Sequence, residues 1–223
     1  MNQTTILCKN GAPRLAADRP FPSSANLSDA LSQLGFKFQT LHSRIRPITG
    51  CPVQGPAYTV QCYPGATHAV EEALEKALPG DVLVVNGEGF IGAVLMGGLM
   101  SGRARQRGLA GAVVDGAVRD VAELKKMQWP VFAAGITPRS GTFAKLGQQQ
   151  AIVSCGDVII QPKDMIVGDE DGVVVIPADL LEETLQLACE IEQREAFITR
   201  ALKNGSSLPE AAQEYQVSQL KKS

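Results

Sequence analysis

The sequence predicts one α/β domain followed by a C-terminal helical tail. Its length of 223 residues fits one large domain or two small ones. Short apolar strands alternate with helical segments in the earlier part of the chain, and β-rich runs cluster between residues 151 and 176. No linker-like stretch or internal repeat divides the chain. We therefore expect an irregular segment at 1–21, the α/β domain at 22–178 and the tail at 179–223.

Composition excludes several classes of protein. Hydrophobic residues make up 44% of the chain and charged residues 20%, which excludes a disordered chain, a collagen-like repeat and a coiled coil. The 21 basic and 23 acidic residues leave a net charge of −2, without the basic surplus of a nucleic-acid binder. Aromatic residues, at 5%, are too few for base-stacking platforms. Small molecules or other proteins are the expected partners.

The sequence gives no sign of export or membrane insertion. The first 15 residues lack the continuous apolar core of a signal peptide. The longest apolar stretch, at 89–100, is broken by glycines and is too short to span a bilayer. We therefore expect a cytoplasmic protein. The cysteines are odd in number and have no CxxC pair, which indicates free thiols rather than a disulfide framework or a zinc site. They are Cys8, Cys51, Cys62, Cys155 and Cys189.

Hydrophobic periodicity and breaker residues place the elements in order. The first helix carries leucines on one face, Pro79-Gly80 ends the second, and Gly108 is a suitable C-cap for the third. The expected helices are 28–34, 67–77, a segment ending near Arg107, 121–127 and 178–202. The expected strands are 55–62, 81–85, 112–115, 131–134 and four short runs between 151 and 176.

A glycine motif, Gly87-x-Gly89-x-x-Gly92, follows the second of these strands. With Asp115 at the end of the next strand, it matches a dinucleotide-binding fingerprint, in which helix amides hold a pyrophosphate. However, Asp115 comes late, and Gly97-Gly98 interrupts the expected crossover helix. Nucleotide binding is therefore the weaker hypothesis for this stretch.

The Gly97-Gly98 pair has two interpretations. One helix can end there and a second begin at Leu99, so that free amides at Gly98, Leu99 and Met100 bind a carboxylate or phosphate. Alternatively, the two glycines simply permit close packing of helices.

Arg119-Asp120-x-x-Glu123 follows the strand that ends at Asp115. Asp120 and Glu123 have the spacing of a capping box for the next helix. The same spacing can place two carboxylates around one hard cation, with Asp115 as a third, while Arg119 offers a planar fork to a substrate carboxylate. Both interpretations stay open on the residues alone.

Two further features have plainer interpretations. Asp169-Glu170-Asp171-Gly172 lies between two apolar runs and lacks the spacing of a calcium loop, which predicts a hairpin turn. His68 follows a Tyr-Pro-Gly turn and is a candidate substrate-binding residue, with a surface or capping role as the alternative.

Taken together, these residues resemble the RraA-like family. Gly98, Arg119, Asp120 and Glu123 fit the pattern Gly-x20-Arg-Asp-x2-Glu, within the stretch GLAGAVVDGAVRDVAEL. The family includes aldolases of 4-hydroxy-4-methyl-2-oxoglutarate and 4-carboxy-4-hydroxy-2-oxoadipate, and also proteins that bind and inhibit ribonuclease E. Established aldolases often carry Asp where Gly98 stands, so Glu123 would supply the missing acidic group here.

The resemblance implies a swivelling β/β/α fold, assembled as a homotrimer or a dimer of trimers with sites between subunits. It implies a divalent metal, Mg²⁺ or Mn²⁺, held by Asp120 with Glu123. Arg119 would bind the substrate's carboxylate and keto oxygen, and the backbone at 98–100 would hold that carboxylate. A glutamate from a neighbouring tail, Glu195 or else Glu192, would reach the same site. The implied activity is cleavage of a 4-hydroxy-2-oxo acid to pyruvate, with decarboxylation of oxaloacetate; the alternative is a non-catalytic regulator.

Overall fold

The computed structural model describes residues 21–220, so Cys8 and nearly all of the segment expected to be irregular lie outside it. The helices are α1 (Ser24–Gln33), α2 (His68–Lys76), α3 (Gly98–Gln106), α4 (Val121–Met127), the 3-10 turn η1 (Ala178–Leu180), α5 (Leu181–Lys203) and α6 (Leu208–Leu220). The strands are β1 (Arg46–Pro47), β2 (Val53–Cys62), β3 (Val82–Met96), β4 (Gly111–Val118), β5 (Val131–Ile136), β6 (Gly147–Gln149), β7 (Val153–Cys155), β8 (Val158–Ile160), β9 (Met165–Gly168) and β10 (Val173–Ile176).

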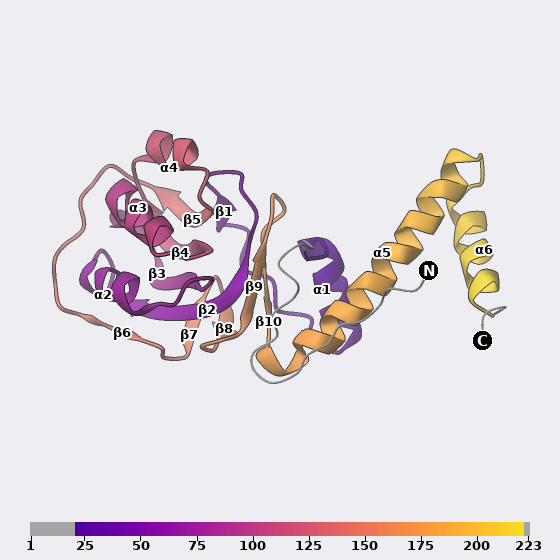
Figure 1. The fold of residues 1–223 in the computed structure, drawn as a ribbon, viewed down its shortest axis with the longest axis horizontal. Coiled ribbons are helices and arrows are strands. Elements are labelled where there is room, and N and C mark those ends of the chain that lie inside the picture. The colour runs from indigo at the N-terminus through magenta and orange to yellow at the C-terminus, as the bar shows by residue number, and fades with distance from the viewer. Residues whose placement is uncertain (1–20, 221–223) are drawn as a thin grey trace.

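One mixed sheet organises the domain, with strand order β1-β5-β4-β3-β2-β9-β10 and β6 paired with β2. Strands β2 to β5 run parallel, and α2, α3 and α4 connect them in turn. The strands β1, β9 and β10 extend the sheet with antiparallel pairings, and β7 and β8 form a separate hairpin. Figure 1 shows the three connecting helices gathered at one side of this sheet. The swivelling β/β/α fold implied by the resemblance is confirmed.

Burial of the parallel strands explains their composition. Every residue of β4 is buried, as is the stretch of β3 from Val82 to Asn86. Parallel strands covered on both faces are near-continuous apolar runs, which is the pattern that predicted them. One core cluster lies between these strands and α2 to α4, and a second lies on the opposite face around Phe132.

A third core cluster joins α1, α5 and the β9–β10 hairpin. The acidic turn of that hairpin is confirmed as a turn, and it fixes the start of α1, because Asp169 accepts hydrogen bonds from the backbone and hydroxyl of Ser24 at 2.8 and 2.7 Å. Beyond this cluster α5 leads away from the sheet and α6 turns back beside its far end (Figure 1). Phe197 and Tyr215 stack edge to face between the two helices at 5.5 Å. No helix within residues 21–220 is long and apolar enough to cross a membrane.

The dinucleotide hypothesis is wrong, because the glycine motif lies inside a strand. β3 continues to Met96, with three register shifts against β4, and it never opens a helix at Gly87. A Cβ at Gly87 would overlap the Leu95 side chain and lie 2.9 Å from the carbonyl oxygen of Asp115. The glycines therefore let a bulged strand pack closely.

Asp115 has a structural role rather than a ligand-binding one. It is 2% exposed and accepts two hydrogen bonds from the Arg44 guanidinium, at 3.1 and 2.9 Å, and one from the Gly156 amide at 2.8 Å. Arg44 also forks onto exposed Asp157, whose pKa these hydrogen bonds lower. Because its oxygens are already engaged, Asp115 is unsuited to act as a third metal ligand.

Four cysteines fall within the described residues, and all four are free, as predicted. Cys62 and Cys155 are fully buried. Burial raises the pKa of the Cys62 thiol to about 12 and raises the pKa of Cys155 as well. These thiols are therefore packing groups rather than nucleophiles.

The two carboxylates that share Arg44 should differ sharply in their contribution to stability. Asp115→Asn should lower the free energy of unfolding by about 1–3 kcal/mol, because it weakens a buried charge-assisted pair. Asp157→Asn, the matched control at the exposed end, should cost less than about 1 kcal/mol. Urea unfolding followed by circular dichroism measures both. Equal losses would contradict the structural role assigned to Asp115.

Candidate active site

A cavity of about 270 Å³ lies where the carboxyl ends of β3 and β4 meet the start of α3. Ligands of open parallel sheets bind at such strand ends, because the loops that follow them converge there. The cavity is lined by Thr67 and Glu71, residues 94–100, Arg119 and Asp120, and Ser140 and Gly141. A second hollow, of about 380 Å³, lies against Ile136 and Pro138 and shares Arg119 and Asp120 with the first.

Asp120 connects two elements of the site instead of capping its own helix. It adopts a left-handed backbone conformation (φ 60°, ψ 39°) and makes no side-chain hydrogen bond to α4. Its Oδ2 instead accepts a hydrogen bond from the Gly98 amide at 2.9 Å. The capping-box interpretation of Asp120 and Glu123 is therefore wrong. Aspartate tolerates this backbone conformation better than most residues, so the turn aims the carboxylate towards α3.

Glycines 97 and 98 leave room for acidic and basic side chains of the next segment. A Cβ at Gly97 would lie 2.8 Å from Oδ2 of Asp120 and 3.1 Å from Cγ of Arg119. A Cβ at Gly98 would overlap the Glu123 carboxylate. The carboxylates of Asp120 and Glu123 thus both lie against Gly98, as the family pattern implies. The glycine pair indeed permits close approach, here between a helix start and side chains from the following turn.

Arg119 spans the cavity wall with part of its guanidinium engaged. Its Nη1 donates to the Ser140 hydroxyl at 3.0 Å, and its Nε lies 3.6 Å from Oδ2 of Asp120. The side chain is 40% exposed, so further donors face solvent. Ser140 belongs to a loop tied down by its neighbours: the Val94 amide donates to the Arg139 carbonyl, and the Thr142 amide to that of Gly65. Arg119 is therefore held in one orientation with donors to spare.

The start of α3 supplies backbone donors. A strand, rather than the expected helix, precedes Gly97, and α3 begins at Gly98. The Gly98 amide is used by Asp120, whereas the amides of Leu99 and Met100 have no acceptor among the described residues. First-turn amides lack intrahelical partners, and the helix dipole makes their surroundings favourable for an anion. These two amides can hold a carboxylate beside Arg119.

The acidic pair at Gly98 fits a hard divalent cation. Within residues 21–220 no group of three or more His, Cys, Asp or Glu side chains gathers at one point. Mg²⁺ commonly takes only one or two protein carboxylates and completes its shell with water and substrate oxygens. Asp120 and Glu123 provide that donor set.

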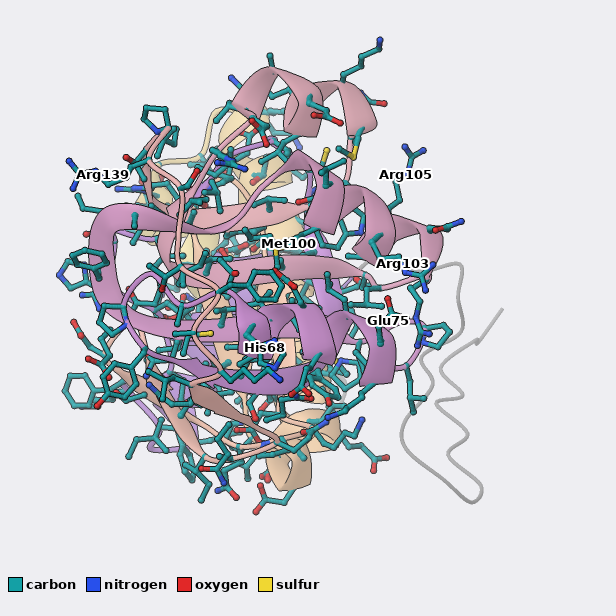
Figure 2. The ribbon with its side chains drawn as sticks, turned by 90° about the vertical axis from the view of Figure 1, so that its left-hand side faces the viewer. His68, Glu75, Met100, Arg103, Arg105 and Arg139 are labelled. Carbon is teal, nitrogen blue, oxygen red and sulfur yellow. The ribbon has the colours of Figure 1, made fainter. Side chains whose placement is uncertain are left out.

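His68 lies beside the cavity rather than in its lining. Its neighbours Thr67 and Glu71 line the wall. The imidazole instead packs against Phe143 at a tilt, with 5.9 Å between ring centroids, and lies 3.8 Å from Glu72. Figure 2 shows His68 on α2, facing the viewer on the same side of the molecule as Met100. Its role in substrate binding stays a prediction.

Glu195 lies on α5, away from the cavity of its own chain, and accepts a hydrogen bond from Asn26 of α1 at 3.1 Å. Within one subunit it therefore belongs to the α1–α5 contact. Its catalytic role stays a prediction.

Sequence reasoning missed Thr67, Glu71 and Ser140 as cavity residues. They come from the start of α2 and from the loop after β5, and they reach Arg119 and Asp120 only through the sheet topology. No motif marks them. The nearest signal was the Tyr-Pro-Gly turn just before Thr67.

Gly98 should tolerate substitution by aspartate, whereas Gly97 should not. Gly98→Asp meets the movable end of Glu123 and, at 3.3 Å, the Cβ of Asp120, and it places a negative charge in the first turn of α3. Because Glu123 can move aside, the free energy of unfolding should change by less than about 1 kcal/mol. Affinity for Mn²⁺, measured by calorimetry, should be at least that of the parent. Gly97→Asp, the matched control, would clash with the Asp120 carboxylate and the aliphatic part of Arg119. It should therefore lower both the free energy of unfolding and the affinity for Mn²⁺. Equal behaviour of the two variants would contradict this geometry.

Comparison with known proteins identifies the family. The sequence model of the RraA-like family, described as Aldolase/RraA, matches residues 24–175. A protein of Halalkalibacterium halodurans, provisionally named 4-hydroxy-4-methyl-2-oxoglutarate aldolase, is 40% identical over 171 residues, which cover 76% of this chain and 79% of that protein.

Solved structures agree. An uncharacterised protein from Pseudomonas syringae superimposes with a TM-score of 0.77 at 30% identity, covering 85% of this chain and 92% of that one. The structure described as the RNA-processing inhibitor RraA from Thermus thermophilus superimposes with a TM-score of 0.62 at 29% identity, covering 67% and 92%. With its fold, its Arg-Asp pair and these matches in agreement, the chain belongs to the Aldolase/RraA family.

Proposed function

We propose that the protein is a divalent-metal-dependent lyase that cleaves a 4-hydroxy-2-oxo acid to pyruvate and also decarboxylates oxaloacetate. The proposed substrates are of the 4-hydroxy-4-methyl-2-oxoglutarate or 4-carboxy-4-hydroxy-2-oxoadipate type. One observation carries the proposal: the hydrogen bond from Gly98 to Asp120 joins a helix start, Arg119 and the Asp120 carboxylate in the wall of one small cavity, with the Glu123 carboxylate against the same glycine.

Substrate binding follows from the donors in that cavity. The substrate carboxylate is held at the amides of Leu99 and Met100, where the dipole of α3 favours negative charge. Arg119 adds a charge-assisted hydrogen bond and reaches the keto oxygen with another donor. Ser140 keeps the guanidinium in place, so less conformational freedom is lost on binding.

The cation would be held by Asp120 and Glu123, with Mg²⁺ or Mn²⁺ suited to their oxygens. When bound, it supplies positive charge that stabilises the oxyanion of the enolate.

Bond cleavage needs an electron sink and a proton acceptor. As the C3–C4 bond breaks, its electron pair moves into the C2–C3 enolate, and Arg119 stabilises the charge that develops on the C2 oxygen. None of the described residues that line the cavity is a lysine, so the site is not built for a Schiff base. The C4 hydroxyl loses its proton as C4 becomes a carbonyl, and the enolate is protonated at C3 to give pyruvate.

The assembly we propose is a cytoplasmic homotrimer, or a hexamer of two trimers. The projecting α5–α6 tail would then bring Glu195 to the cavity of a neighbouring subunit, where it would orient a water for proton transfer. In the single chain, Oε2 of Glu195 accepts a hydrogen bond from Asn26.

A regulatory role is the second candidate. It is favoured by the similarity to the Thermus thermophilus structure described as an RNA-processing inhibitor. A regulator of ribonuclease E or of another partner would show the same fold without turnover.

The direct test is pyruvate release. The purified protein with oxaloacetate and Mg²⁺, or with 4-hydroxy-4-methyl-2-oxoglutarate, should produce pyruvate in a lactate dehydrogenase-coupled assay, and EDTA should abolish it. Asp120→Asn keeps an acceptor for the Gly98 amide but removes a ligand charge, so kcat/KM should fall by at least about 100-fold.

The two possible failures of this test are distinct. Parent protein without turnover on either substrate favours the regulatory role. Parent-like turnover in Asp120→Asn at low Mg²⁺ would show that Asp120 is not a metal ligand.

A further inference from the structure

We propose that Glu71 is the catalytic residue that takes the proton from the C4 hydroxyl of the substrate, an inference that rests on the proposed aldolase function. Glu71 lines the cavity from the α2 side, together with Thr67, and shares it with Arg119, Asp120 and the start of α3. A cavity of this size holds one small organic acid, so groups on its different walls reach the same molecule.

The local structure holds the Glu71 side chain in place. Its backbone amide donates to the Thr67 carbonyl at 3.1 Å, and the Thr67 hydroxyl donates to its Oε1 at 3.2 Å. No hydrogen bond of Oε2 falls within the described residues, so this oxygen is available to a ligand. Glu71 also lies in the first turn of α2, where the helix dipole favours a carboxylate. Figure 2 shows this turn, marked by His68, next to the α3 turn marked by Met100.

The other carboxylates near the site already contact other groups or lie outside the cavity lining. Asp120 accepts the Gly98 amide and is the proposed cation ligand, and Glu123 lies against Gly98 outside the cavity lining. Glu72 is directed to Gln149 and Lys76 on the outer side of α2. Glu71 is therefore the cavity carboxylate left for proton transfer.

The proton balance of the step is complete. Glu71 takes the proton of the C4 hydroxyl as the oxygen electrons form the C4 carbonyl, and the electrons of the C3–C4 bond form the enolate. The enolate then takes a proton from water at C3, and Glu71 releases its proton to solvent. Decarboxylation of oxaloacetate forms the same enolate by losing CO₂ and has no C4 hydroxyl to deprotonate. Only aldol cleavage therefore needs Glu71 as an acceptor.

This difference gives the test. Glu71→Gln keeps the size of the side chain and an oxygen for Thr67 but cannot accept a proton. We expect kcat for cleavage of 4-hydroxy-4-methyl-2-oxoglutarate to fall by about 10²–10⁴-fold. Decarboxylation of oxaloacetate by the same preparation should fall far less, by no more than about 10-fold, and Glu71→Asp should recover part of the cleavage activity.

Glu72→Gln controls for the loss of a negative charge, and Glu195→Gln tests the other residue proposed to take part in proton transfer. Glu72→Gln removes one negative charge from the adjacent position outside the cavity and should leave both reactions near parent rates. Selective loss of cleavage in Glu71→Gln, with its partial recovery in Glu71→Asp, supports the proposal. Equal loss of both reactions, no loss of either, or selective loss of cleavage in Glu195→Gln instead would overturn it. A parent protein inactive towards both substrates would reject the proposed function itself.

Discussion

The hydrogen bond between the Asp120 carboxylate and the Gly98 amide joins the two halves of the site. Gly98 begins α3 after β3, and Asp120 precedes α4 after β4, so the bond connects the ends of neighbouring parallel strands. It also sets the place of Arg119, the residue before Asp120. A left-handed turn at Asp120 directs its side chain across to α3 instead of into its own helix, which places the carboxylate in the cavity wall.

Close backbone approach is the constraint that this bond imposes. Neither Gly97 nor Gly98 could carry a side chain without meeting a residue of the Arg-Asp-x-x-Glu segment. At Gly98 the neighbour is the carboxylate of Glu123, so an acidic group lies beside the start of α3.

Local signals predicted much of the fold, and long-range contacts account for most of what was missed. The helix at 121–127 and the acidic turn after β9 were predicted correctly, because hydrophobic periodicity and turn chemistry are local properties. β3 was expected to end at Val85 because glycines usually end strands, whereas here they permit bulges that continue to Met96. The motif grouped Arg119, Asp120 and Glu123 with Gly98. The predicted capping by Asp120 was wrong because its left-handed φ turns the side chain towards Gly98, and the sequence does not encode that φ locally. Thr67, Glu71 and Ser140 join them only because parallel strands place their loops at one edge.

Affinity for oxalate, a planar mimic of the pyruvate enolate, tests most directly whether this arrangement is a binding site for a 2-oxo acid. Calorimetric titration in the presence of Mg²⁺ should show binding to the parent protein. In Arg119→Lys, which keeps the charge but loses the fork held by Ser140, binding should be weaker by about 10–100-fold. Equal affinity in the two proteins, or no binding to the parent, would contradict the account.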